Sequence, residues 1–259
     1  MANYTREFLT SKHKHYQEKI NDWAFHYRSY TGGQDYQNGF LLNRYVLETD
    51  EEYLKRAENT PIDNHCKNVV QIYSSFLFRV PPTRDYGTLD GDPAIESFTK
   101  DADLDGRSFN NVIKEMQINS SIYGTCWAII DKPRAVTKTR AEELQQDIRP
   151  YISLYTPENV LNWNYERLAN GRFYLTSLSL VEEATEDYAI IKVWSLEDIS
   201  TFVVEDFNKP YAEGKVKMID EIPNILGEIP AVVLYNQKSQ RRAIGISDLN
   251  DVAELQKSI

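Results

Sequence analysis

One continuous stretch, residues 103–133, constrains the fold of this chain most strongly. It opens with an acidic turn, after which the Ser108 hydroxyl is suited to accept a hydrogen bond from the first free amides of a helix. Gly124 is expected to end that helix, since a residue without a Cβ readily adopts the left-handed conformation common at helix C-termini. The apolar side chains of the predicted helix recur at helical spacing: Phe109, Val112, Ile113, Met116 and Tyr123.

A short apolar run follows this helix directly. Residues 126–130 are all apolar and are bounded by Asp131 and Pro133. Such a run is typical of a strand that is covered on both faces. Because the patterns before it are mostly helical and those after it mostly β, the sequence predicts an α+β fold that ends in a further helix.

The acidic turn also resembles the opening of a calcium-binding loop. Asp101, Asp103, Asp105 and Gly106 match the first ligands and the bend glycine of an EF-hand. The twelfth position, which requires a bidentate Glu, is Val112. A solvated turn is therefore the preferred interpretation, and we predict neither a metal site nor a cofactor.

The overall charge limits the possible partners. The 259 residues include 29 basic and 39 acidic side chains, a net charge of −10, so no global field attracts nucleic acid. An acidic surface is still compatible with a conduit that DNA must pass without sticking. The longest apolar runs are about five residues, far short of the ~20 that span a bilayer, so we predict no membrane association. Cys66 and Cys126 lie among apolar neighbours and are expected to be buried free thiols.

Two long helices are predicted before the central stretch, together with short ones at residues 51–57 and 94–100. Residues 4–30 favour a helix whose narrow apolar stripe includes Trp23 and Tyr27, and a stripe this narrow is typical of a face that meets a partner. Residues 35–47 are expected to form a loop or a short strand. A second helix is predicted to begin with Thr60 as its N-cap and to end before Pro81. Its apolar positions are Ile62, Cys66, Val69, Val70, Tyr73, Phe76 and Leu77.

The second half of the chain has the pattern of a meander. Strands are predicted at residues 172–181, 188–194 and 201–204, and residues 209–224 are expected to be irregular. A strand at residues 231–235 precedes a polar loop with Arg241 and Arg242. Ser247 is then expected to cap the last helix. Asp248 and Asp251 lie in its first turn, and its apolar positions are Leu249, Val252, Leu255 and Ile259.

Motifs of catalysis do not occur in the sequence. It contains no Walker loop, no dinucleotide glycine fingerprint, no Gly-x-Ser-x-Gly elbow and no Cys-x-x-Cys pair. Four scattered histidines and two separated cysteines leave few ways to pair a nucleophile with a base. We therefore predict no catalytic residues and a protein that is not an enzyme.

Several landmarks from Thr60 onwards resemble, in their order, the portal proteins of tailed bacteriophages. They are the Asp103-Leu104-Asp105-Gly106 turn before a helix, Tyr123-Gly124 before the strand at 126–130, Asp131-Lys132-Pro133, Arg149-Pro150-Tyr151, Asn162-Trp163, and the strand at 231–235 followed by Gly245-Ile246-Ser247-Asp248-Leu249.

The resemblance implies a homo-oligomeric ring, usually dodecameric, at one vertex of the capsid. Such a ring conducts double-stranded DNA during packaging and ejection and docks the terminase and the tail adaptor, so the chain is expected in the virion after assembly in the host cytoplasm. It also implies three parts: a helical region at 1–80, an α+β wing-like domain at 81–245 and the start of a stem helix at 246–259. The chain is then expected to continue beyond Ile259.

The resemblance also suggests which residues lie at a subunit interface or near the channel. For Arg241 and Arg242 a contact to DNA, a contact to a neighbouring subunit and a solvated loop all stay open. Two other functions stay open as well: a different phage head-assembly or adaptor protein, and an enzyme that holds a divalent metal around residues 101–105. The candidate residues are Trp23, Tyr27, Arg241, Arg242, Ser247, Asp248 and Asp251.

Overall fold

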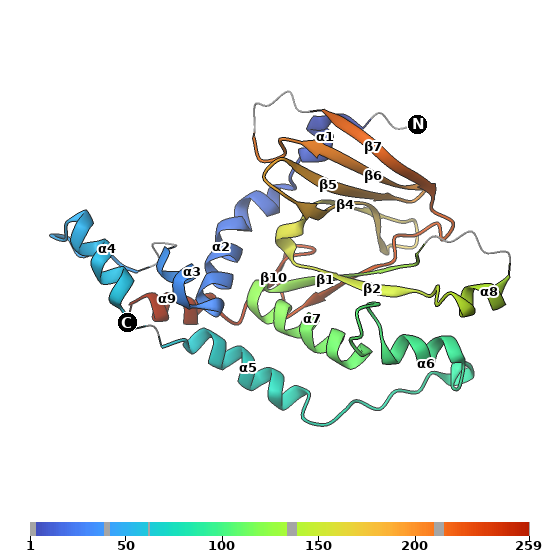
Figure 1. The fold of residues 1–259 in the computed structure, drawn as a ribbon, viewed down its shortest axis with the longest axis horizontal. Coiled ribbons are helices and arrows are strands. Elements are labelled where there is room, and N and C mark those ends of the chain that lie inside the picture. Colours follow the sequence, from blue (N-terminus) through green and yellow to red (C-terminus); the bar gives the residue numbers. More distant parts are fainter. Residues whose placement is uncertain (1–3, 39–41, 62, 134–138, 210–214, 259) are drawn as a thin grey trace. The chain divides into compact units, whose positions relative to one another are not determined.

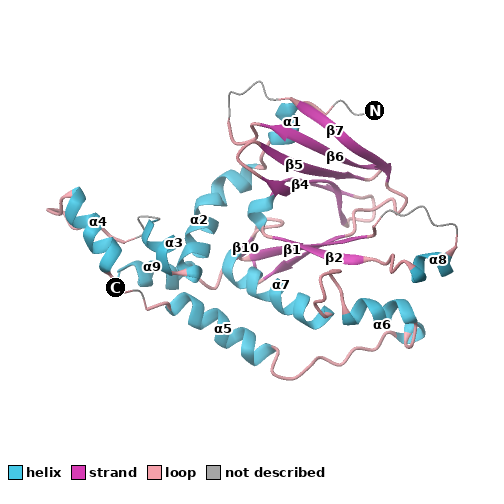
Figure 2. Ribbon diagram, viewed as in Figure 1, coloured by secondary structure: helices cyan, strands magenta, loops and turns pink. Residues whose placement is uncertain are grey.

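The protein is a mixed α+β structure in a computed structural model that describes residues 4–38, 42–61, 63–133, 139–209 and 215–258 (Figures 1 and 2). It divides into two compact units. Unit 1 comprises Met1–Ile20 and Tyr155–Pro230, and unit 2 comprises Asn21–Leu154 and Ala231–Ile259. The predicted fold class is confirmed. The boundaries predicted after residues 80 and 245 stay a prediction.

Unit 1 is built around one antiparallel sheet of five strands in chain order. Each strand pairs with the next, as in a meander, and the predicted strands at 172–181, 188–194 and 201–204 are all present. The segment expected to be irregular contains a fifth strand, so that prediction was wrong; its residues 210–214 lie outside the described part. The strands are β3 (Val160–Arg167), β4 (Phe173–Ala184), β5 (Tyr188–Ser195), β6 (Asp198–Glu205) and β7 (Val216–Pro223).

The sheet of unit 1 has buried side chains on both of its faces. Leu178, Ile191 and Phe202 are fully buried, and the register pairs Ile191 with Phe202. α1 (Arg6–Thr10) follows Tyr4, whose ring lies 5.1 Å from that of Phe202. The Thr5 hydroxyl accepts from the Phe8 amide and caps α1. The register opposes Leu178 to Trp194 and Val181 to Ile191, so Leu178 lies on the face of the sheet opposite to Ile191 and Phe202.

Unit 2 contains a smaller sheet in the order β2-β1-β8. β1 and β8 are antiparallel, with Thr125 opposite Tyr235 and Ile129 opposite Ala231. The three strands are β2 (Tyr151–Tyr155), β1 (Thr125–Asp131) and β8 (Ala231–Tyr235). α7 (Phe109–Tyr123) packs on this sheet, and the core between them is made of Ala102, Val112, Met116, Cys126, Ala128 and Ile152.

The central stretch folds as the sequence predicted. The Ser108 hydroxyl accepts from the Asn111 amide at 3.4 Å, and Gly124 ends α7 with φ = 83°. Five consecutive residues of β1, from Thr125 to Ile129, are buried. The turn, helix and strand are therefore confirmed.

Helices make up the rest of unit 2, and α2 begins in unit 1. The short arm formed by α3 and α4 has its own apolar cluster of Tyr36, Leu42, Tyr53 and Ala57. α5 contacts α7 and α9. Within the described ranges no helix is long and apolar enough to cross a membrane. The helices are α2 (Lys14–Thr31), α3 (Gly33–Asn38), α4 (Asp50–Asn59), α5 (His65–Leu77), α6 (Pro93–Lys100), α8 (Arg140–Gln145) and α9 (Asn250–Ser258).

Three predictions about the helices before residue 80 were wrong. The first helix is interrupted between α1 and α2, and α3 occupies part of the segment expected to be a loop or strand. Thr60 does not begin α5: it is the C-cap of α4, and the Asn64 side chain instead accepts from the Lys67 amide at 2.7 Å. Ile62, the first apolar position predicted for α5, lies outside the described residues. α9 begins at Asn250, three residues after Ser247.

The apolar face of α9 also differs from the prediction. Leu249, Ala253 and Gln256 are buried, whereas Leu255 is exposed. The predicted position Ile259 lies outside the described residues. The buried face of α9 therefore includes the polar Gln256, whereas the apolar pattern of the sequence had assigned Leu255 to that face.

Candidate functional site

All seven candidate residues belong to unit 2. Trp23 and Tyr27 lie one turn apart on α2, as predicted, but they differ in exposure: Trp23 is 2% exposed and Tyr27 is 45% exposed. The Tyr27 ring is stacked on Tyr123 of α7, with centroids 6.0 Å apart and planes within 12°. Trp23 is therefore part of the interior of the chain, and only Tyr27 presents surface.

Ser247 and Asp248 lie against the C-terminal end of α7. The Ser247 hydroxyl is within hydrogen-bond distance of two carbonyls there, those of Ser121 at 2.8 Å and Ile122 at 2.6 Å. The Asp248 amide donates to the Ser121 carbonyl at 3.0 Å. These bonds satisfy carbonyls that a helix end leaves without an intrahelical partner. Ser247 thus fixes the end of α7, and its hydroxyl also accepts from the Leu249 amide at 3.0 Å, in the turn that leads into α9.

Two glycines allow the chain to cross at this point. A Cβ added to Gly245 would lie 1.9 Å from the Gly124 carbonyl oxygen, and one added to Gly124 would lie 2.7 Å from the Gly245 oxygen. Backbone therefore passes directly over backbone, which only glycine permits. The Gly245 amide also donates to the Thr125 hydroxyl at 2.7 Å. This hydrogen bond connects the segment before α9 to the first residue of β1.

Two residues that sequence reasoning missed complete this arrangement. The Asn236 side-chain amide donates to the Asp248 carboxylate at 2.8 Å and to the Ile246 carbonyl at 3.1 Å. Gln256 accepts from the Cys66 amide at 3.1 Å and donates to the Ser29 carbonyl at 3.0 Å, which joins α9 to α5 and α2. For Gln256 the sequence did carry a signal. Leu249, Ala253 and Gln256 follow one another at steps of four and three residues, which places them on one face of a helix.

Arg241 and Arg242 are displayed at the tip of a small hairpin. Its strands are β9 (Gln237–Lys238) and β10 (Gly245–Ile246), which pair antiparallel. The Ser239 hydroxyl accepts from the Arg241 amide at 3.0 Å, and the Ala243 amide donates to the Tyr235 hydroxyl at 2.9 Å. Both arginines are exposed, as is Asp251 in the first turn of α9. A constrained loop thus presents two positive charges to solvent.

The acidic turn at residues 101–106 is closed by protein donors. The Asp103 carboxylate accepts from the amides of Asp105 and Arg107 at 3.0 and 3.1 Å and from the Arg107 guanidinium. The Asp101 carboxylate accepts from the Gly106 amide at 2.8 Å and from Arg149 at 2.6 Å. Among the residues that the structure describes, no three His, Cys, Asp or Glu side chains form a group that could hold a metal ion.

The charge of Asp103 stabilises this turn. Desolvation by burial raises the pKa of its carboxyl, but the hydrogen bonds from Arg107 and from the two amides outweigh it and leave the pKa below its usual value. The ionised form is therefore the one that the fold favours.

The two thiols have no environment for nucleophilic chemistry. Burial raises the pKa of Cys66 to about 11 and that of Cys126 to about 12. Because the thiolate is the reactive form, both are inert at neutral pH. They are free and buried, as predicted.

The comparisons with known proteins identify the family. A search of curated proteins found no match to the chain. The family model described as phage portal protein, SPP1 Gp6-like, matches residues 10–259, and this match confirms the resemblance stated from the landmarks. Portal proteins are structural and non-enzymatic, so the prediction that the chain is not an enzyme is confirmed as well. The chain therefore belongs to the SPP1 Gp6-like phage portal protein family.

Proposed function

We propose that this protein is a subunit of a dodecameric ring at one vertex of a phage capsid, through which double-stranded DNA passes during packaging and ejection. The observation that carries the proposal is the family match over residues 10–259. The protein is then part of the virion and is assembled in the host cytoplasm. Its further partners are the terminase during packaging, the capsid, and the tail adaptor afterwards.

The charge of the chain supports a role as a conduit. A surface with net charge −10 does not hold DNA phosphates tightly, since strong binding requires many basic contacts. Arg241 and Arg242 are the local exception, because the hairpin places two positively charged residues at exposed positions next to each other. We assign these two residues to a contact near the channel or with the next subunit.

The other candidate residues divide into two roles. Tyr27 and Asp251 are exposed, and we propose that they contact a neighbouring subunit. Trp23, one turn before Tyr27 on α2, is buried and is proposed to hold this part of the helix in place. Ser247 and Asp248 are proposed to set the direction in which α9 leaves unit 2, because they bind the end of α7. The start of the stem then depends on these bonds.

The test is the oligomeric state of the full-length gene product. Its mass is measured in solution at several salt and protein concentrations, and particles are imaged by electron microscopy. We expect closed rings with a central hole. A compact monomer or dimer under every condition would contradict the proposed function and would favour an adaptor or other head-assembly protein.

A further inference from the structure

A turn in the arm of unit 2 carries two apolar side chains at its centre. The chain reverses at Val46 and Leu47, and the Glu48 amide donates to the Tyr45 carbonyl at 3.1 Å. Val46 is 99% exposed and Leu47 is 94% exposed. Central turn positions are ordinarily occupied by Gly, Pro, Asn, Asp or Ser, so folding of the turn does not call for two aliphatic side chains there. We name residues 45–48 the apolar turn.

Hydrogen bonds hold the apolar turn in one conformation. Arg56 donates to the two Glu48 carboxylate oxygens at 2.7 and 2.9 Å and to the Asn43 carbonyl at 2.7 Å. Arg44 donates to the Glu48 carbonyl at 2.9 Å. The hydrogen bond from Arg56 keeps the pKa of Glu48 below its usual value, so this carboxylate stays ionised. A rigid element that already displays its apolar side chains loses little conformational freedom when it binds.

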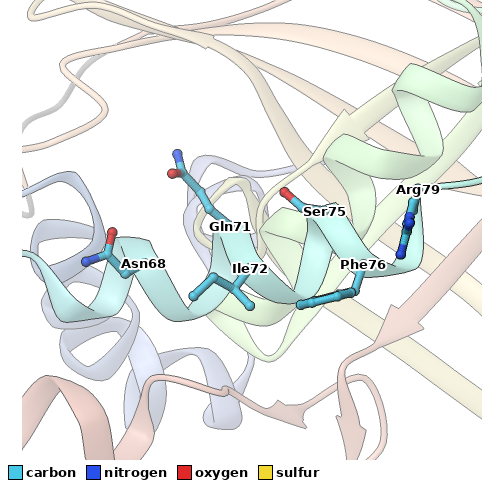
Figure 3. Close-up of a pocket in the computed structure, with 6 residues that line it drawn as sticks. All are labelled: Asn68, Gln71, Ile72, Ser75, Phe76 and Arg79. Atoms are coloured by element: carbon cyan, nitrogen blue, oxygen red, sulfur yellow. The ribbon is translucent and has the colours of Figure 1, made fainter.

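An open groove runs along α5. It has a volume of about 520 Å³, and its lining comes from α5 and from Arg79, just after the end of this helix. Ile72 follows the buried Val70 by two residues, about 200° around the helix, so the groove faces away from the side of α5 that packs inside unit 2. Phe76, in the middle of the groove, is 71% exposed. Figure 3 shows the lining residues, which are Asn68, Gln71, Ile72, Ser75, Phe76 and Arg79.

The apolar stripe continues beyond the groove. Tyr73, Leu77 and Val80 are exposed beside it, at the three- and four-residue steps of a buried helix face. Of the apolar positions that the sequence predicted for α5, Cys66 and Val70 are buried, whereas Tyr73, Phe76 and Leu77 are exposed in the described chain. Contiguous exposed apolar surface of this kind marks an interaction site.

The charges around the turn and the groove are opposite. Residues 44–59, which include the apolar turn and α4, contain five acidic and three basic side chains, a net charge of −2. Residues 65–80, which include α5, contain Lys67 and Arg79 and no acidic side chain, a net charge of +2. In a chain of net charge −10, a basic helix next to an exposed apolar groove favours an acidic partner segment.

Within one chain, the apolar turn and the start of α5 lie at opposite ends of α4. The C-terminal end of α4 leads into α5, so the apolar turn lies at the opposite end of α4, about 15 Å further along that helix (Figure 1). A closed ring needs two different, complementary surfaces on each subunit. The turn and the groove are such a pair.

We propose that the apolar turn of one subunit inserts into the α5 groove of the next subunit and so forms a repeating contact of the ring. The proposal rests on the proposed function, because it takes a second copy of this chain as the partner. Val46 and Leu47 cover Ile72 and Phe76, and the acidic first turn of α4 lies near Arg79.

Disulfide trapping tests the contact directly in the full-length protein. The double variant Val46→Cys with Ser75→Cys places one new thiol in the turn and one in the groove, while the native Cys66 and Cys126 are buried. On oxidation we expect a ladder of covalent oligomers that collapses on reduction. Either single variant alone is expected to give no ladder, and an equal mixture of the two single variants is expected to give covalent dimers and nothing larger. Rings that yield no ladder, or only an internally linked monomer, would overturn the proposal.

A charge-swap series gives an independent test. Leu47→Asp and Phe76→Arg each place a charge in the contact, and each is expected to abolish rings while the circular dichroism spectrum of the subunit is unchanged, since both side chains are exposed. The double variant pairs the two charges and is expected to restore rings. Rings formed by both single variants would overturn the contact.

The outcomes separate this inference from the proposed function. If the wild-type protein forms no rings, the proposed function fails. If it forms rings but gives neither the ladder nor the loss of rings in the charge variants, then only the contact between the apolar turn and α5 is wrong.

Discussion

The sheet of unit 1 and helix α5 of unit 2 cover their apolar side chains to very different degrees. Strands β4, β5 and β6 contribute Leu178, Ile191 and Phe202, which are all fully buried. α5 buries Cys66, Val70 and Ser74, whereas Phe76 and its apolar neighbours face solvent. The same kind of hydrophobic spacing therefore serves two purposes. In the sheet, the buried apolar side chains stabilise the folded subunit. On α5, the exposed ones are available for contact with another subunit.

Unit 2 is closely packed where Gly245 crosses Gly124, although part of the apolar surface of α5 is exposed. Substitution of Gly245 tests this close packing. Gly245→Ala places a Cβ against the Gly124 carbonyl, which is backbone and cannot rotate away. We expect a loss of about 4 kcal/mol or more in the free energy of unfolding, measured by urea titration.

Gly91→Ala is the matched control for that variant. Gly91 has φ = 79° but no atoms within 4 Å of the added Cβ, so only backbone strain of ~1 kcal/mol is expected. Equal losses for the two alanine variants would contradict the close approach of residues 124 and 245.

A pair of identical truncations tests the comparison between the sheet and α5. Leu178→Ala in β4 removes a fully buried side chain and should cost about 2–5 kcal/mol in the free energy of unfolding. Leu77→Ala on α5 removes an exposed side chain and should change the stability of the unassembled subunit by less than about 0.5 kcal/mol. Similar losses at both positions, in thermal or urea unfolding, would mean that the α5 face is covered within the subunit.

The acidic turn before α7 predicts a dependence on pH. The folded state lowers the pKa of Asp103, so the stabilisation is present above the ordinary value of about 3.9 and is lost as the pH falls through the folded pKa. Asp103→Asn should lower the free energy of unfolding by about 1.5 kcal/mol at neutral pH. Below pH ~4 this free energy should then fall less steeply in the variant than in the wild type. A variant whose acid unfolding curve keeps the wild-type slope would show that this carboxylate does not carry the effect.

The stacked tyrosines should have the smallest effect. Tyr27→Ala removes the contact with Tyr123 and should cost about 0.5–1 kcal/mol in the unassembled subunit, because the ring is half exposed. Tyr27→Phe retains the stack and is expected to unfold at the wild-type urea concentration. If Tyr27→Ala weakens assembly more than folding, as the proposed interface requires, the ring fraction will fall while the unfolding midpoint barely moves.

Local patterns predicted the elements whose signals lie close together in the sequence. Ser108, Gly124 and the apolar run after it placed α7 and β1 correctly, since caps, glycine and unbroken hydrophobicity act within a few residues. The same kind of signal was misleading at Thr60 and Pro61, which have the pattern of a helix start but follow α4. Asn64 supplies the real cap of α5.

Features that depend on distant partners could not be predicted. β7 was missed because it is an edge strand with exposed charged positions and pairs with β6 alone in the described sheet. The crossing of Gly245 over Gly124 joins residues more than 100 positions apart, as does the hydrogen bond from the Asn236 backbone amide to the Gly124 carbonyl. The exposure of α5 is of the same kind, because spacing reveals an apolar face but not what covers it.

Thiol labelling in assembled and unassembled protein tests most directly whether α5 is covered only on assembly. Ile72→Cys introduces a thiol in the groove, Glu186→Cys introduces one at an exposed turn of unit 1, and the native thiols are buried. We predict that labelling of Ile72→Cys slows by at least about tenfold in rings relative to free subunits, while labelling of Glu186→Cys is unchanged. Equal labelling rates for Ile72→Cys in rings and free subunits would contradict the account.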